Sequence, residues 1–344
     1  AALLVAAAVL AAVSAIWLLP GGEGPQEAPP IPVSGEERPL EQVSTNTFPA
    51  ELLWQIPLSE TDAPDSASMP AEIAVLDGRI FVLDTNHSRI LEIDDEGNVL
   101  QVLDSQSDGR LALQGPMAIT AYDGMLYVAN SGGGNVIVLD PEGVVERVIS
   151  PQVAPAEHPL RPIGIAVARN GHIFLSDPDN HRILHLDEEG ALVSSLGSGA
   201  RDSGEYGLNT PGGLSLDARG NLYVVDMLNY AMKKYSPSGK FLLQVGEAGD
   251  TEGTFSRPKA VAVDTDGRIF VSDTLQVAVE VFASDGRYAG FIGRDNPEDR
   301  RSDSIFQAPH GLKIVGDTLY VVDRFAGLFA FELPPEVASQ TSTD

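Results

Sequence analysis

A unit of 46 to 51 residues recurs six times along this chain, and this repeat constrains the fold more than any other feature. Each unit opens with a proline, followed by a short alternation of apolar residues such as PIGIAV or PKAVAV. The opening prolines are Pro70, Pro116, Pro162, Pro211, Pro258 and Pro309. Self-similarity at such a period is typical of folds that pack copies of one supersecondary unit side by side.

The first five units each contain the pattern of four short strands. The first apolar alternation ends in a two-residue turn such as Asp77-Gly78 or Asn170-Gly171, whose residues tolerate the positive φ that tight hairpins need. A second run such as IFVLD follows, then a third, another glycine turn, and a fourth run such as the one at 240–246. The second runs end at Asp84, Asn130, Asp177, Asp226, Asp273 and Asp323. Four short strands per repeated unit are typical of the blade of a β-propeller. The sequence therefore predicts an all-β, six-bladed propeller.

The sixth unit lacks a fourth strand, because Pro334-Pro335 and a polar tail follow its third run. A spare apolar run at 52–57 precedes the first unit and matches the pattern of 241–246. We therefore expect the N-terminal strand to complete the last blade, which closes the ring and removes a loose sheet edge. The propeller is predicted to span 48–334, with a polar C-terminal tail at 335–344.

Residues 1–19 form an apolar run with Ser14 as its only polar residue. A helix of this length spans about 28 Å, close to the roughly 30 Å hydrocarbon core of a bilayer. Trp17 stands where an interfacial aromatic residue belongs. The run predicts a transmembrane helix; a cleaved signal peptide ending near Val13-Ser14-Ala15 is the alternative.

Residues 20–47 are rich in Pro, Gly and Glu and predict an extended tether. Between Pro20 and Glu37 the tether contains glutamates but no Lys or Arg. Because cytoplasmic flanks are enriched in Lys and Arg, we expect a single-pass protein with a cytoplasmic N-terminus and a periplasmic or extracellular propeller.

The charge and the cysteine count exclude several classes of function. The formal net charge is −27, and such an acidic body repels phosphate backbones, so no nucleic-acid partner is expected. The chain has no cysteine, which excludes disulfides, thiolate metal sites and a cysteine nucleophile. The glycines open no phosphate-binding loop, and no cofactor is expected.

The repeat resembles the NHL family over about residues 48–333. The densest match is SDPDNHRILHLDEEG at 176–190, which contains Asp177 and Arg182, and LDTNHSRILEID at 83–94 is also close. At the position of Arg182 the other units have Asn135, Ala231, Ala278 and Leu328. The resemblance implies the propeller fold. It does not fix a function, because NHL propellers include protein-binding, RNA-binding, sensor and enzyme domains.

Two residues are weak candidates for a metal site. Some NHL propellers resemble a lyase domain that binds zinc through histidines after the opening proline in three blades; here His310 alone matches, so no catalytic zinc site is predicted. Glu72 lies where gluconolactonase-like propellers hold a divalent ion. The alternative is a solvated carboxylate in a wet channel or a partner of Lys259 or Lys313.

The loops of the fourth to sixth units have apolar residues where the family has small and polar ones. An apolar patch there would suit a protein partner, and small residues in a membrane helix allow close packing against other helices. The sequence therefore predicts a non-enzymatic scaffold subunit that docks on the extracytoplasmic side of an integral membrane complex, for example a respiratory or photosynthetic one. The alternative is a ligand-sensing or metal-dependent enzyme that uses the channel. The predicted contact residues are Ala7, Ala8, Ala11, Ala12, Trp17, Met227, Leu228, Tyr230, Leu275, Val277 and Phe325.

Overall fold

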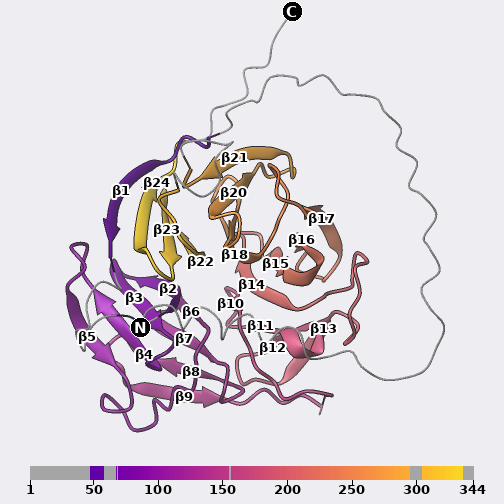
Figure 1. Ribbon diagram of the computed structural model, residues 1–344. Helices are drawn as coiled ribbons and strands as arrows, with labels where there is room; N and C mark the ends of the chain where they lie inside the picture. The colour runs from indigo at the N-terminus through magenta and orange to yellow at the C-terminus, as the bar shows by residue number, and fades with distance from the viewer. Residues whose placement is uncertain (1–46, 58–66, 68, 155, 295–303, 336–344) are drawn as a thin grey trace, which may run out of the picture. The chain divides into compact units, whose positions relative to one another are not determined.

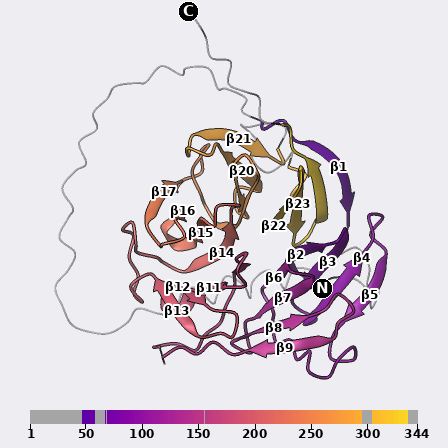
Figure 2. The ribbon, with the colours of Figure 1, turned by 180° about the vertical axis from the view of Figure 1, so that it is seen from behind.

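The predicted propeller is confirmed. A computed structural model shows six antiparallel sheets of four strands each, arranged as blades around a central axis (Figure 1; seen from behind in Figure 2). The predicted membrane helix, the tether and most of the tail lie outside the described residues. Within them, no helix is long and apolar enough to cross a membrane. The structure describes residues 47–57, 67, 69–154, 156–294 and 304–335.

The first three blades follow the chain in order, with the first strand at the axis and the fourth at the rim (Figure 1). Blade 1 contains β2 (Pro70–Leu76), β3 (Arg79–Asp84), β4 (Arg89–Ile93) and β5 (Val99–Leu103). Blade 2 contains β6 (Ala118–Tyr122), β7 (Met125–Asn130), β8 (Asn135–Leu139) and β9 (Val145–Ile149). Blade 3 contains β10 (Ile165–Val167), β11 (Ile173–Asp177), β12 (Arg182–Leu186) and β13 (Leu192–Leu196).

The last three blades repeat this order. Blade 4 contains β14 (Pro211–Leu216), β15 (Leu222–Asp226), β16 (Ala231–Tyr235) and β17 (Phe241–Val245). Blade 5 contains β18 (Pro258–Val263), β19 (Ile269–Asp273), β20 (Ala278–Phe282) and β21 (Tyr288–Ile292). Blade 6 contains β22 (Pro309–Val315), β23 (Thr318–Asp323), β24 (Gly327–Glu332) and the N-terminal β1 (Glu51–Ile56).

The N-terminal strand closes the ring, as the sequence predicts. Strand β1 pairs antiparallel with β24, with Leu52 opposite Phe331 and Ile56 opposite Leu328. Because β1 precedes blade 1 in the chain and completes blade 6 in space, the two ends of the propeller are held in one sheet (Figure 1). The edge of β24 is thereby paired.

The two-residue turns between first and second strands form as predicted in blades 1, 2 and 6. In blade 1, Leu76 pairs with Arg79, and the two residues between them have φ values of 51° at Asp77 and 82° at Gly78. Two consecutive positive φ values are the signature of the type I′ turn, whose twist suits antiparallel strands. In blades 3, 4 and 5 the turn between first and second strands is longer, with five residues between the last paired ones. The predicted two-residue turn at Asn170-Gly171 is therefore wrong: Val167 pairs with Ile173. One predicted strand is shorter than expected: β10 begins at Ile165 and not at Pro162.

The core consists of apolar layers between neighbouring blades. Between blades 5 and 6, for example, Phe270, Phe306 and Phe329 are buried in one cluster. Phe306 meets Phe329 edge to face, with ring centroids 4.9 Å apart. Each blade therefore buries both of its faces against its neighbours, and closing the ring leaves none of these layers uncovered.

The residue that ends each second strand is a fully or almost fully buried Asp or Asn. In blades 1 and 3 the carboxylate forms an ion pair with the arginine five residues later: Asp84 with Arg89 and Asp177 with Arg182, each at 2.8 Å. In blade 4, Asp226 instead contacts the buried ammonium of Lys233 at 3.0 Å. The carboxylate keeps its place while its partner changes.

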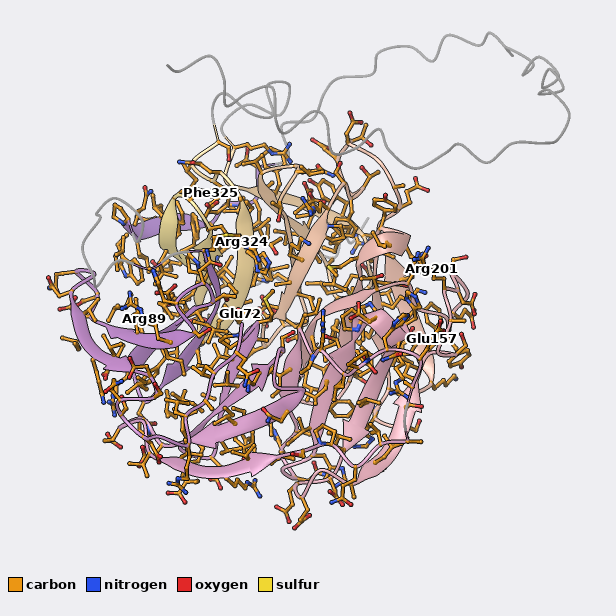
Figure 3. All side chains as sticks on the ribbon, turned by 60° about the horizontal axis from the view of Figure 1, so that its bottom comes forward. Glu72, Arg89, Glu157, Arg201, Arg324 and Phe325 are labelled. Carbon is orange, nitrogen blue, oxygen red and sulfur yellow. The ribbon has the colours of Figure 1, made fainter. Side chains whose placement is uncertain are left out.

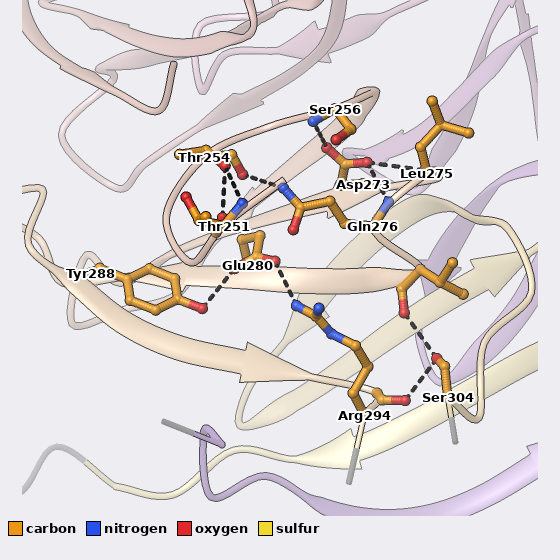
Figure 4. A network of polar contacts seen from close by, with 12 residues as sticks. Thr251, Thr254, Ser256, Asp273, Leu275, Gln276, Glu280, Tyr288, Arg294 and Ser304 are labelled. Atoms are coloured by element: carbon orange, nitrogen blue, oxygen red, sulfur yellow. Dashed lines mark hydrogen bonds and ion pairs between the residues drawn. The ribbon is translucent and has the colours of Figure 1, made fainter. Parts of the chain in front are cut away.

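In blades 5 and 6 the equivalent carboxylate accepts hydrogen bonds from backbone N–H groups. Asp323 accepts hydrogen bonds from four N–H groups at 2.7 to 2.9 Å, and these tie the loop after β23 to the segment entering β22. Asp273 does the same in blade 5, where a second buried network joins Glu280 to Tyr288 and Arg294 (Figure 4). The donors to Asp323 are Gln307, Ala308, Phe325 and Ala326.

Deleting residues 47–57 from the full chain should leave β24 as an unpaired edge strand. We expect a lower melting temperature and concentration-dependent aggregation, because an exposed edge pairs with other chains. Size-exclusion chromatography and thermal unfolding measure both effects. A deletion variant that stays monomeric with an unchanged melting temperature would show that β1 is dispensable.

Replacing Asp323 with Ala should destabilise the fold by about 3 kcal/mol, because four backbone donors lose their acceptor. The Asp323→Asn variant keeps one acceptor oxygen, as Asn130 does naturally in blade 2, so its loss should be smaller. Urea unfolding compares the two variants. Equal losses would mean that the side-chain volume matters and the acceptor does not.

Candidate functional site

The candidate site is the central channel, where the first strands of all six blades meet. They enclose a cavity of about 180 Å³. The first strands enter at the end of the ring where each opening proline stands, and we call this end the entry face. At the second position after the proline, five blades have Gly or Ala and blade 1 has Glu72.

Close packing explains the small residues. A side chain at Gly213 would approach the Cα of Ala260 to 2.7 Å, and one at Gly311 would meet the carbonyl oxygen of Ala71 at 2.6 Å. The carboxyl of Glu72 fills this space, since its Oε1 lies 2.6 Å from the same point above Gly311. Glu72 is therefore the one large side chain at this level of the six described first strands, as the sequence indicated.

Burial raises the pKa of Glu72 to about 8. The Glu72 side chain is half-buried and lines the cavity. The N–H of Ile73 donates to Oε1 at 3.2 Å, and Lys313 acts on it through space; both oppose the effect of burial. Burial also lowers the pKa of Lys313, whose Nζ crosses to the hydroxyl of Thr120 in blade 2 at 3.3 Å. The sequence offered Lys259 and Lys313 as partners of Glu72, and of these two it is Lys313 that lowers the pKa of Glu72.

His310 uses both ring nitrogens within the protein. Its Nδ1 lies 2.8 Å from the carbonyl oxygen of Ala71, which can only accept, so Nδ1 is the donor. Its Nε2 then accepts from Nη2 of Arg324 at 2.7 Å. Burial, with the charge of Arg324, lowers the pKa of His310 to about 3, so the ring stays neutral near pH 7. It orients Arg324 in this arrangement and has no nitrogen left for a metal. In the described part of the chain, no group of three or more His, Asp or Glu could hold a metal ion.

Three cations gather beside His310 on the entry face: Arg257, Lys259 and Arg324. Burial, then the charges of Arg257 and Arg324, lower the pKa of Lys259 to about 8, while Asp273 raises it. Burial and Arg257 also lower the pKa of Arg324. No carboxylate among the described residues forms an ion pair with any of the three. Sequence reasoning missed this cluster, because the residues come from two blades and share no motif.

An exposed apolar surface lies on the same face. Leu228, Leu275 and Phe325 each stand two residues after a strand-end Asp and are 50%, 46% and 56% exposed. We call these three residues the apolar arc. Hydrogen bonds from their loops to the segments that open β14, β18 and β22 place the arc at the entry face. Phe325, Arg324 and Glu72 follow one another down Figure 3. The equivalent positions in blades 1 to 3 are Asn86, Gly132 and Asp179.

Three other predicted contact residues are less accessible. Val277 is 9% exposed and belongs to the core between blades 5 and 6, so its prediction as a surface residue is wrong. Met227 and Tyr230 are half-buried and pack against the core between blades 4 and 5. Loop residues next to a strand can turn inward, which the apolar character of the sequence does not reveal. Ala7, Ala8, Ala11, Ala12 and Trp17 lie outside the described residues.

No family model matches the chain, and no curated protein matches it in sequence. Solved structures do match its fold. A gluconolactonase from Xanthomonas campestris is 18% identical with a TM-score of 0.58, covering 84% of this chain and 98% of its own. A putative gluconolactonase is 17% identical with a TM-score of 0.60, covering 83% and 94%. Virginiamycin B lyase from Staphylococcus aureus is 15% identical with a TM-score of 0.55, covering 82% and 99%. Such identities show a shared propeller fold.

The raised pKa of Glu72 predicts a pH-dependent effect of the Glu72→Gln substitution. Between about pH 4.5 and 8 the folded state keeps a proton that the unfolded state has lost, so wild-type stability falls as the pH rises. Gln removes this loss. We expect the variant to gain about 2 kcal/mol over the wild type at pH 9, after allowing for solvent in the channel, and almost nothing at pH 4. Chemical unfolding at both pH values measures the difference, and a gain independent of pH would contradict the assignment.

Proposed function

We propose that this chain is a non-enzymatic interaction subunit of the NHL-repeat type, which docks a protein partner on the entry face of its propeller. The observation that carries the proposal is the apolar arc, with exposed apolar residues at one equivalent position in three consecutive blades. A single exposed leucine needs no explanation, but a repeated position that changes from polar to apolar along half of a ring favours an interface.

The arc suits an interface energetically. Burying apolar surface contributes roughly 25 cal/mol per Å², and large apolar side chains near the centre of a contact dominate binding. In blades 5 and 6 the buried carboxylates of Asp273 and Asp323 accept hydrogen bonds from the N–H groups of Leu275 and Phe325 themselves. In blade 4, Asp226 accepts from the N–H of Asn209, whose carbonyl oxygen accepts from the N–H of Leu228. Little conformational entropy is therefore lost when a partner covers these side chains.

The N-terminal region supplies the second part of the proposal. Residues 1–19 would anchor the chain in a membrane, with the propeller on the extracytoplasmic side and a membrane protein complex as its partner. Small residues in this helix would pack against helices of the complex. Because the 20–47 tether joins the helix to the propeller, each contact would raise the effective concentration for the other, and neither alone would need to bind tightly.

A ligand-binding or enzymatic channel is the second candidate, and Glu72 favours it. A carboxyl with a pKa near 8 can act as a general acid or base near neutral pH. The gluconolactonase and lyase named above share the fold, but they supply no site residues at such low identity. An enzyme would need further groups around Glu72, whereas a docking propeller would not. Loss of a measured turnover in Glu72→Gln with unchanged partner retention would favour this candidate.

Replacing Leu228, Leu275 and Phe325 together with Ser should weaken partner retention while the propeller stays folded. The matched control replaces Leu100, Val193 and Leu242, which are 60%, 51% and 45% exposed on the fourth strands of blades 1, 3 and 4. Membranes are solubilised in mild detergent, and the chains that co-purify with each variant are quantified by mass spectrometry. We expect several-fold less partner with the arc variant and wild-type amounts with the control.

The same experiment separates the possible failures. An arc variant that unfolds, as judged by thermal unfolding, would assign these side chains to blade stability. An arc variant that folds and retains its partner fully would overturn the proposed docking surface. An equal loss with the control triple would mean that general surface polarity, and not the arc, governs retention.

A further inference from the structure

The cation cluster on the entry face is opposite in sign to the net charge of the chain, which is −27. The sequence has 49 acidic and 22 basic residues, yet the charge of Arg257 lowers the pKa of both Lys259 and Arg324, and the charge of Arg324 lowers that of Lys259. Like charges held together cost free energy unless an opposite charge compensates them. A compensating carboxylate would be easy to supply in such an acidic chain, so its absence from the described surroundings needs an explanation.

Arg324 is held in place and left with an unused donor. Its Nη2 donates to Nε2 of His310, which is itself fixed by the carbonyl oxygen of Ala71. Its Nε is buried and has no hydrogen-bond partner. A buried donor without an acceptor costs about 1 to 3 kcal/mol. Because His310 holds Nη2, the guanidinium is oriented before any ligand arrives, as a binding group would be.

Lys259 has a similarly poor partner. Its Nζ has three donor hydrogens, and the one acceptor that the structure gives it is the thioether sulfur of Met227 at 3.7 Å. Thioether sulfur is a weak acceptor. Met227 belongs to the loop that also holds Leu228 of the apolar arc, so the ammonium lies between the channel and the arc.

The nearest carboxylates are already used by the backbone. Asp273 accepts from the N–H groups of Ser256 and Arg257, and Asp323 accepts from those of Gln307 and Ala308. Both are completely buried and hold their loops together. They cannot turn toward the cations without releasing these donors, so neither of these two carboxylates supplies the compensating anion.

We propose that Arg324, Lys259 and Arg257 form a binding site for a carboxylate group at the entry face of the channel, with His310 as a positioning residue. The guanidinium of Arg324, which His310 orients, and the ammonium of Lys259, whose one described acceptor is a thioether sulfur, match the two oxygens of a carboxylate. The carboxylate can belong to a small organic acid or to an acidic residue of a bound protein. The site goes beyond the docking function proposed above, since a free organic acid can fill it without any partner.

The test measures carboxylate binding to the full chain in detergent at low ionic strength by isothermal titration calorimetry. The first probe is succinate. We expect Arg324→Gln and Lys259→Met each to weaken its binding about tenfold, because each removes a charge-assisted hydrogen bond. The control is Arg287→Gln, whose guanidinium is exposed and pairs with Asp285. Unliganded melting temperatures of the two site variants should equal or exceed that of the wild type, because a repulsive charge has been removed.

The second probe separates the two sources of the carboxylate. It is a short apolar peptide ending in Asp, compared with the same peptide ending in Asn-amide. Succinate binding that survives the triple Ser substitution of the apolar arc identifies a small-acid site. Binding of the acidic peptide alone, lost in both the arc variant and Arg324→Gln, identifies a carboxylate of a docked protein. If neither probe binds the wild type more tightly than Arg324→Gln, the proposal is overturned.

The role of His310 and of Lys259 has its own readout. The groups facing Lys259 are Arg257, Arg324, the neutral His310 and the backbone-bonded Asp273. Because the pKa of Lys259 is about 8, affinity for succinate should fall between pH 7 and 9.5, and Lys259→Met should abolish this dependence. His310→Ala should weaken binding at all pH values, and His310→Gln, which keeps an acceptor for Arg324, should restore part of it. A pH profile unchanged in Lys259→Met would exclude Lys259 from the site.

Discussion

The propeller depends on one interaction repeated in every blade, the buried carboxylate or amide at the end of the second strand. A buried charge is tolerable only when hydrogen bonds or an opposite charge satisfy it. Here the solutions differ between blades, from Arg89 and Arg182 to Lys233 and to backbone amides alone. The side chain is always the same kind of acceptor. In blades 2, 4, 5 and 6 it also fastens the end of the second strand to the segment that opens the blade, at the entry face.

This fastening explains why the loops can vary without loss of the fold. The first residue after the strand-end Asp or Asn can contribute its side chain to the structure, as Thr274 does through the carbonyl oxygen of Pro309 and Arg324 through His310. The second residue contributes its backbone N–H in blades 4 to 6, where its side chain is exposed. The apolar arc thus occupies a position at which the side chain can change without disturbing these backbone hydrogen bonds, and such loop positions are where new binding properties arise most easily.

The sequence predicted the fold well because its signals are local and repeated. Glycine turns, apolar alternation and a strand-end Asp or Asn recur in every unit, and the missing strand of blade 6 pointed to β1. The candidate site was harder to predict from the sequence. Glu72 and His310 stood out singly, but the grouping of Lys259 with Arg324 depends on how two blades meet, and the inward turn of Val277 depends on packing. Neither follows from the pattern of one strand.

The acidity of the chain bears directly on what the entry face can bind. A net charge of −27 creates a negative field that repels anions at long range and is screened by salt. Attraction to Arg324 and Lys259 acts at short range, in a partly desolvated place where charges interact more strongly. A polyanion would meet the repulsion over its whole length, whereas a single carboxylate meets it once and reaches both cations. At the proposed site the charge distribution would therefore favour small or locally acidic ligands over nucleic acids. Salt screens the long-range field and would weaken the repulsion that such acidic ligands meet on approach.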